Sequence, residues 1–282
     1  MRANRARGWS ACTFVIAVAT VVLGTDSIGR AADPDALWKI VHDECVPDQR
    51  QNSDPAPCAL VDQHEGDAKG YAVLKDIVGA TQYLLIPTAR VPGIESALLL
   101  APDAPNYFAD AWRELGFTER AEGFPLPRQA ISLAINSAFG RSQNQLHIHI
   151  DCIRADIAAT LQRQLGAIGD SWAPLPEPLA GHSYWAIRVL GDDLDRIDPF
   201  KLLADGVPGA REAMGKQTLV VVGAEFADGR PGFIILTDRA NPATGDKAAG
   251  EELQDHLCAI AQTLHRSTPP EPGHSTVTPK GH

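Results

Sequence analysis

The spacing of hydrophobic residues predicts two helices in the first half of the chain. Apolar residues recur every three or four positions over residues 35–45 and again over residues 106–115. Such spacing gathers the apolar side chains on one face of a helix, which can then pack against a sheet. The apolar face of the second segment includes Trp112, which we expect to lie in the core.

Four short apolar runs predict strands that pair as two hairpins. Residues 71–75 and 82–86 flank a short turn, and residues 130–135 and 145–150 flank the longer polar turn 136–144. Strands joined by such turns pair in the antiparallel direction. The order of hairpin, helix and hairpin therefore predicts an α+β fold, in which helices pack on an antiparallel sheet.

The second half of the chain carries a similar pattern, which suggests an internal duplication with halves 33–170 and 171–266. Residues 183–189 resemble residues 82–88, and residues 218–222 resemble the apolar strand that ends before Asn136. The alternative is that two unrelated hairpins resemble each other by chance.

The proposed alignment of the two halves also predicts that the second copy is degenerate. Residues 233–238 fall opposite residues 146–151, so that both histidines of the first copy are replaced by apolar residues. Asn136 falls opposite Gly223. We therefore expect any chemistry to lie in the first half.

Residues 1–31 have the composition of an export signal. Three arginines without acidic neighbours precede the apolar run 9–24. This run is at the short end for a membrane span of ~20 residues, so a cleaved signal peptide and a retained signal-anchor are both compatible with it. Small residues at Gly29 and Ala31 fit cleavage after Ala31. In both cases the folded part faces the outside of the membrane.

The remaining composition bounds the folded domain and its partners. Residues 267–282 are rich in Pro, Ser, Thr and Gly and predict a disordered tail, which leaves residues 33–266 as the folded domain. The chain has 35 acidic and 25 basic residues, a formal charge of −10. This balance disfavours nucleic acid as a partner but is compatible with a small phosphorylated substrate.

The cysteines agree with export. Cys12 lies in the apolar run, and the other four form an even set, which is typical of two disulfides in an oxidising compartment. We favour Cys45 with Cys58, because the segment between them lacks apolar periodicity, and therefore Cys152 with Cys258. A zinc site is the rival interpretation, but no C-x-x-C element is present. Free buried thiols are the third.

The most reactive chemistry lies at the end of the first half. Side chains alternate along a strand, so His147, His149 and Asp151 lie on one face while the apolar residues between them enter the core. A neutral imidazole needs no deprotonation to attack phosphorus near neutral pH. The turn that precedes these residues carries hydrogen-bond donors suited to phosphate oxygens. The proposed substrate-binding residues here are Asn136, Ser142, Gln143 and Asn144.

Other polar residues are weaker candidates. Lys75 and Arg90 flank the first hairpin and could neutralise a pyrophosphate, although such residues are more often solvated surface charges. His182 could reach the site from the second half, or it could be structural. The remaining histidines considered are interpreted as structural or surface residues: His42, His64 and His256.

Alternating histidines after an Asn and a glycine-containing turn resemble the motif of the histidine triad superfamily. The resemblance implies that His149, as the middle histidine, forms a nucleotidyl intermediate and that His147 is the first member. It also implies that Asn136 and Gln143 supply amide groups around the ribose and phosphate. The third position is Asp151 instead of histidine, which leaves the role of that residue open.

More widely, the chain after residue 31 resembles the CDP-diacylglycerol pyrophosphatase family. The motifs that carry this resemblance are dispersed and include the cysteines, which makes them more specific than H-x-H alone. They are Asp43-Glu-Cys45, Pro57-Cys58, Tyr71 to Asp76, Gln82 to Thr88, Ser132 to Asn136, Gln143-Asn144, His147 to His149, Cys152 to Arg154, Gly181-His182 and Gln254 to His256.

The resemblance implies hydrolysis of CDP-diacylglycerol to CMP and phosphatidate without a cofactor. It also implies that the reaction takes place at the membrane surface on the periplasmic side of a bacterial inner membrane. The opposing hypothesis is an exported metal-binding module in which His147, His149 and Asp151 hold zinc or copper. That hypothesis gives no purpose to the donor-rich turn.

Overall fold

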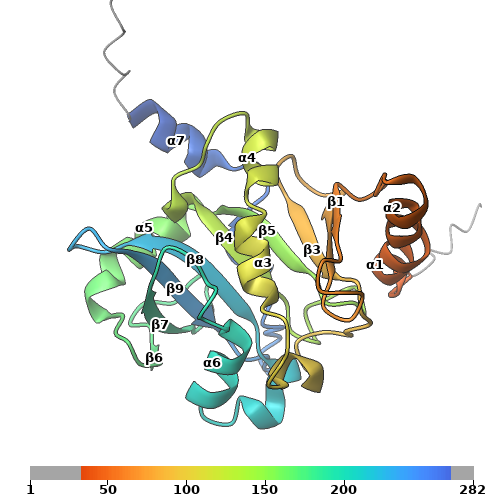
Figure 1. Cartoon of the computed structure of the whole chain (residues 1–282). Coiled ribbons are helices and arrows are strands. Elements are labelled where there is room, and N and C mark those ends of the chain that lie inside the picture. Colours follow the sequence, from red (N-terminus) through yellow and green to blue (C-terminus); the bar gives the residue numbers. More distant parts are fainter. Residues whose placement is uncertain (1–32, 268–282) are drawn as a thin grey trace, which may run out of the picture. The chain divides into compact units, whose positions relative to one another are not determined.

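The computed structural model describes residues 33–267 and contains one ten-stranded sheet (Figure 1). All of its strand pairs are antiparallel, in the order β1-β2-β3-β5-β4-β8-β9-β7-β6, and β10 pairs with β5. The strands are β1 (Leu60–Asp62), β2 (Tyr71–Lys75), β3 (Tyr83–Pro87), β4 (Ile131–Ile135), β5 (Ile148–Ile153), β6 (Ala173–Pro174), β7 (Trp185–Leu190), β8 (Leu219–Glu225), β9 (Pro231–Thr237) and β10 (Gln254–Asp255).

Helices pack on this sheet, which confirms the predicted α+β class. The α-helices are α1 (Ala36–Lys39), α2 (Val46–Asn52), α3 (Tyr107–Arg113), α4 (Gly116–Glu122), α5 (Ala155–Gln164), α6 (Pro199–Gly206) and α7 (Ala259–Ser267). Shorter helical segments are the π-helical η1 (Ile40–Cys45) and the 3-10 turns η2 (Ala97–Leu100), η3 (Arg128–Ala130), η4 (Leu165–Ala167), η5 (Arg211–Lys216) and η6 (Gly250–Leu253).

The sheet buries both faces. Ile150 of β5 and Val221 of β8 belong to a core cluster with Phe108 of α3 and Phe200 of α6. Residues on the opposite face, such as Ala134 of β4, belong to a second cluster with α5 and the C-terminal segment. Directly paired residues of an antiparallel sheet share a face, and Ala134 pairs with His149. The side chain of His149 therefore lies on the α5 face.

The predicted first hairpin and the predicted helix after it are confirmed. Strands β2 and β3 pair in register from Tyr71 with Pro87 to Lys75 with Tyr83. Helix α3 begins after Asn106, whose side chain accepts a hydrogen bond from the Ala109 N–H at 3.2 Å and so caps the helix. Trp112 packs edge-on against Phe233, as expected of a core residue.

The start of β5 was predicted three residues too early. The strand begins at Ile148, because the residues before it bind the loop after β3 instead of a neighbouring strand. The buried Gln145 side chain donates to the carbonyl oxygens of Pro87 and Ala89, at 3.0 and 2.8 Å. The Leu146 N–H donates to the Val91 carbonyl at 2.6 Å. These tertiary hydrogen bonds override the local β pattern.

The N-terminal and C-terminal helix boundaries also differ from prediction. Helical structure continues beyond Cys45 through α2, because Val46 is buried and Pro47 lies in the first turn, where its missing N–H is tolerated. At the other end, the sequence predicts a C-terminal helix over about residues 251–264. Instead η6, β10 and a left-handed backbone at Cys258 precede α7. The pairing of β10 with β5 holds this segment extended.

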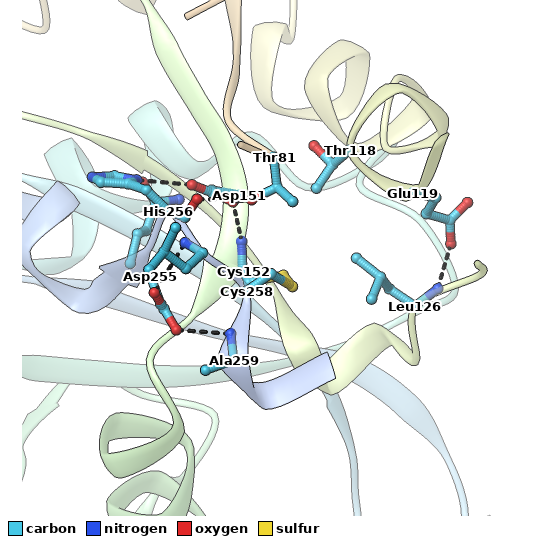
Figure 2. The surroundings of a disulfide bond; sticks show 12 residues. Thr81, Thr118, Glu119, Leu126, Asp151, Cys152, Asp255, His256, Cys258 and Ala259 are labelled. Atoms are coloured by element: carbon cyan, nitrogen blue, oxygen red, sulfur yellow. Dashed lines mark hydrogen bonds and ion pairs between the residues drawn. A yellow bond between two sulfur atoms is a disulfide. The ribbon is translucent and has the colours of Figure 1, made fainter. Parts of the chain in front are cut away.

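Both predicted disulfides are present. Cys45 is joined to Cys58 and Cys152 to Cys258, with Cα–Cα distances of 5.6 and 5.1 Å. The second disulfide fastens the end of β5 to the segment before α7 (Figure 2). Because stable disulfides form in oxidising compartments, the pair indicates an extracytoplasmic domain.

Removing the second disulfide should destabilise the fold more than removing the first. The chain-entropy model gives about 4.7 kcal/mol for the 106-residue separation of Cys152 and Cys258, against about 3 kcal/mol for the 13-residue separation of Cys45 and Cys58. Urea unfolding of the two paired Cys→Ala variants measures the difference directly. Equal losses of unfolding free energy would contradict this ranking.

No helix within residues 33–267 is both long enough and apolar enough to span a membrane. The predicted export signal, residues 1–31, lies outside the described residues. So does the predicted tail, apart from Ser267 at the end of α7.

Candidate active site

The three polar residues of the β5 segment are buried close to one another. His147, His149 and Asp151 have exposed fractions of 8, 4 and 0 %. The two imidazole centroids lie 4.9 Å apart. Ile148 and Ile150 lie in the core cluster on the opposite face, so the predicted alternation along the strand is correct.

His149 is held by one ring nitrogen only. Its Nδ1 lies 2.6 Å from Nε2 of Gln82, which also donates to Oδ2 of Asp76 at 2.8 Å. Its Nε2 is buried without a hydrogen-bond partner among the described residues. Oε2 of Glu251 lies 3.6 Å from this nitrogen. Burial, followed by the neighbouring imidazole of His147, lowers the pKa of His149 to about 3. The ring is therefore neutral near pH 7.

The tautomer of His147 follows from its backbone contact. Its Nδ1 lies 2.7 Å from the carbonyl oxygen of Gln145, which can only accept, so Nδ1 carries the proton and Nε2 a lone pair. Burial lowers the pKa of His147 as well. The site therefore presents two neutral imidazoles side by side.

Glu251 approaches the histidines from η6. Its backbone N–H donates to Oδ1 of Asn136 and its Oε2 accepts from Nδ2 of Asn136, both at 3.1 Å. Burial raises the pKa of Glu251, but His149 and the Asn136 hydrogen bond outweigh burial, and the net effect lowers that pKa. An ionised carboxylate thus lies beside Nε2 of His149.

Asp151 supports a third histidine. Its carboxylate accepts hydrogen bonds from the Thr81 hydroxyl at 2.7 Å and the Cys152 N–H at 2.8 Å, and lies 2.8 Å from Nδ1 of His256 (Figure 2). The hydrogen bond to Asp151 raises the pKa of His256. The other ring nitrogen of His256 lies 3.5 Å from Oε1 of Glu251. His256, interpreted from sequence as structural or surface, is thus joined to the histidine pair through two carboxylates.

Three residues of this site were not predicted from the sequence: Gln82, Glu251 and His256. Gln82 and His256 occur in the dispersed family motifs, which is the signal that could have identified them. No local pattern distinguishes Glu251. It lies more than a hundred positions after Asn136 and meets it only because η6 follows β9 back across the sheet.

The predicted phosphate-binding turn contacts the N-terminal segment. Gln143 donates from Nε2 to the Asp33 carbonyl at 3.0 Å, and its Oε1 accepts from the Leu37 N–H at 3.2 Å. The side chains of Ser142 and Asn144 are exposed beside it. The turn thus anchors the start of α1 and leaves two polar side chains toward solvent.

Three other candidates have protein partners elsewhere. Lys75 donates to the Asp76 and Gly79 carbonyls of its own hairpin, at 2.8 and 3.0 Å. Arg90 forms an ion pair with Asp35. His182 contacts Glu252 through Nδ1 at 2.7 Å, so the structure connects it to the neighbour of Glu251 and not directly to His149.

The antiparallel sheet, the two disulfides and the buried histidine pair define, as a class, an extracytoplasmic α+β enzyme. The family model described as CDP-diacylglycerol pyrophosphatase matches residues 32–262. A CDP-diacylglycerol pyrophosphatase of Yersinia pestis is 44% identical over 235 residues, which cover 83% of this chain and 88% of that protein. The chain belongs to the CDP-diacylglycerol pyrophosphatase family, as the dispersed motifs predicted.

Proposed function

We propose that this chain hydrolyses CDP-diacylglycerol to CMP and phosphatidate through a nucleotidyl intermediate on His149. The diphosphatase activity and its substrate follow from family membership. The observation that carries the covalent route is the state of His149: a neutral imidazole whose Nδ1 is engaged by Gln82 and whose Nε2 has no partner. A neutral imidazole can attack phosphorus through Nε2 when its proton is on Nδ1, which here requires the Gln82 amide to turn its oxygen toward Nδ1.

In the first step, Nε2 of His149 attacks the cytidylyl phosphorus. A P–N bond forms, the bond from that phosphorus to the bridging oxygen breaks, and phosphatidate leaves with the bonding electrons. Attack requires the ring proton on Nδ1, where the Oε1 atom of Gln82, buried without a partner, can accept it once the side-chain amide rotates. The amide of Asn136 and the imidazole of His256, whose pKa is raised by its hydrogen bond to Asp151, are the proposed donors that stabilise the charge developing on the phosphoryl oxygens.

In the second step, water attacks the same phosphorus and the P–N bond breaks. Glu251 is the proposed base, because its carboxylate is ionised and lies 3.6 Å from Nε2 of His149, next to the intermediate. The proton leaves water for Glu251, and CMP is released with His149 regenerated. His147 remains neutral. Its Nδ1 donates to the Gln145 carbonyl, and the lone pair on its Nε2 can accept a hydrogen bond.

The substrate-binding residues are proposed in the same terms. Asn136 is linked to the site of reaction through its reciprocal hydrogen bonds with Glu251, the proposed base. Ser142 and Asn144 have exposed side chains that can meet the nucleotide from the turn. For Gln143, Lys75 and His182, binding requires release from the partners described above, so their roles remain predictions.

We further propose that the fold is a duplicated histidine triad-like unit. The strand orders β2-β3-β5-β4 and β6-β7-β9-β8 are equivalent, and β4 pairs with β8 where the two meet. If Asp238 is aligned with Asp151, as the sequence suggests, Leu236 corresponds to His149. Leu236 pairs with Ala186, one residue beyond the Trp185 that the sequence alignment put opposite Leu84, the partner of His149. The same registers put Val222, not Gly223, opposite Asn136. The support for a duplication is therefore the equivalent strand order, together with the pairing around His149 and Leu236, which matches to within one residue.

The reaction is proposed to take place on the periplasmic face of a bacterial inner membrane. The disulfides support an extracytoplasmic domain, and the substrate is a membrane lipid whose pyrophosphate lies at headgroup level. The acyl chains can therefore stay in the bilayer while the headgroup enters the site. The metal-binding alternative is disfavoured because both Asp151 oxygens are already engaged by Thr81, Cys152 and His256.

Hydrolysis in water labelled with heavy oxygen tests which phosphorus is attacked. The proposal predicts that the label appears in CMP and not in phosphatidate, because water opens the bond between the cytidylyl phosphorus and His149. Mass analysis of both products gives the answer from one reaction. Label in phosphatidate would contradict attack at the cytidylyl phosphorus, while leaving the family's overall reaction intact.

A further inference from the structure

Three side chains of ligand type gather at the end of β9, separated from β5 by strands β4 and β8. Asp238 directly follows β9, Asp246 lies in the loop toward η6, and His182 lies in the turn before β7. One ligand atom from each lies within 4.8 Å of the other two.

Asp238 has a buried oxygen that no protein group satisfies. The residue is 7 % exposed, its Oδ1 accepts from the Arg239 N–H at 2.7 Å, and its Oδ2 is buried without a hydrogen-bond partner. Leaving a buried carboxylate oxygen unpaired is costly, and such atoms call for an explanation such as a bound ion. This oxygen is on the carboxylate that lies within 4.8 Å of a ligand atom of His182 and of Asp246.

The neighbouring side chains are oriented as metal ligands usually are. Nδ1 of His182 faces Oε1 of Glu252, which also accepts from the Tyr184 hydroxyl at 2.8 Å. A carboxylate on one ring nitrogen keeps the proton there and leaves the lone pair on the other, the arrangement common around protein-bound metals. Asp246 is fixed by the Ala248 N–H, which donates to its Oδ1 at 2.8 Å.

A shared proton is the rival explanation. Burial raises the pKa of Asp238 to about 6, opposed by the hydrogen bond from the Arg239 backbone and helped by the charge of Asp246 and a side-chain hydrogen bond with it. A proton shared by the two carboxylates therefore relieves their repulsion at acidic pH. At higher pH Asp238 loses this proton while its carboxylate still faces that of Asp246. A divalent cation neutralises both at once and also uses the lone pair of His182.

We propose that His182, Asp238 and Asp246 form a binding site for a divalent metal ion of the zinc or manganese type. One imidazole with two carboxylates suits these ions, whereas Ca²⁺ and Mg²⁺ prefer sites made of oxygen ligands alone. The ion links the turn before β7 to the end of β9. Through Glu252 it also steadies η6, the segment that carries Glu251 to the histidine pair.

Calorimetric titration of the chelator-treated protein with ZnCl₂ and MnCl₂ tests the site, with CaCl₂ and MgCl₂ for comparison. We expect one Zn²⁺ or Mn²⁺ per chain and a rise of several degrees in the Tm of the wild type. Asp238→Asn and Asp246→Asn should abolish both effects. Glu252→Gln, which removes the charge beside Nδ1 of His182 but keeps an oxygen for the Tyr184 hydroxyl, should lower the affinity about 10–100-fold. His64→Ala, an exposed histidine beside a carboxylate, should bind like the wild type.

Two results would overturn the proposal. The first is a wild type that neither binds Zn²⁺ or Mn²⁺ at millimolar concentration nor changes its Tm with them. A higher Tm of metal-free Asp238→Asn would then support a proton shared by the two carboxylates. The second is equal stoichiometry and affinity in the wild type and both Asp→Asn variants, which would place the ion elsewhere. Neither result depends on turnover, so the proposed mechanism at His149 is tested separately.

Discussion

His149→Gln should lose turnover by on the order of 10⁴-fold or more, because the covalent route has no other nucleophile. Gln is preferred to Ala because the His149 side chain is buried and Ala would leave a cavity. His147→Gln should keep measurable activity. The measurement is kcat for CDP-diacylglycerol hydrolysis in detergent, with vesicle binding and Tm to verify folding.

His64→Gln is the matched control for this prediction, since His64 is an exposed histidine whose ring contacts the carboxylate of Asp62. It should behave like the wild type. A His149→Gln enzyme within about tenfold of the wild type would mean a barrier change of only ~1.4 kcal/mol. That result would exclude His149 as the nucleophile.

Glu251→Gln should lower kcat by about 10²–10⁴-fold with a smaller change in KM, because it removes the proposed base but keeps the shape and the contact with Asn136. Rapid-mixing kinetics should show that the first product, phosphatidate, still forms in a burst. The loss then belongs to the second step. Glu225→Gln, an exposed glutamate on β8, is the control and should leave both constants unchanged.

Loss of the phosphatidate burst together with steady-state turnover would assign Glu251 to the first step. An unchanged kcat would remove it from the chemistry altogether. Both outcomes differ from the result expected of a base that acts only on water.

The spacing of apolar residues was sufficient to predict elements whose structure depends on residues close together in the sequence. The β2–β3 hairpin and helix α3 follow from periodicity and a capping Asn106, and the alternation in β5 correctly placed His149 on the face opposite Ile148 and Ile150. The start of β5 could not be predicted, because Gln145 binds carbonyl groups more than fifty residues earlier. The continued helix after Cys45 likewise depends on burial of Val46.

The residues of the candidate site also fall into those that the sequence could predict and those that it could not. His147 and His149 were predicted because their spacing is visible on a single strand. Glu251 and His256 were not, because η6 and β10 bring them to the site from the far end of the chain. Asp151, whose role the sequence left open, proves to hold His256 through a hydrogen bond that no spacing rule anticipates.

The covalent intermediate itself is the most direct test of the account. Protein mixed with labelled CDP-diacylglycerol is quenched within a single turnover and digested without acid, because a P–N bond is labile in acid. Peptide mass analysis should find one cytidylyl group on His149, formed and lost at rates compatible with kcat, and accumulating in Glu251→Gln. No adduct in either protein, or an adduct on a residue other than His149, would contradict the account.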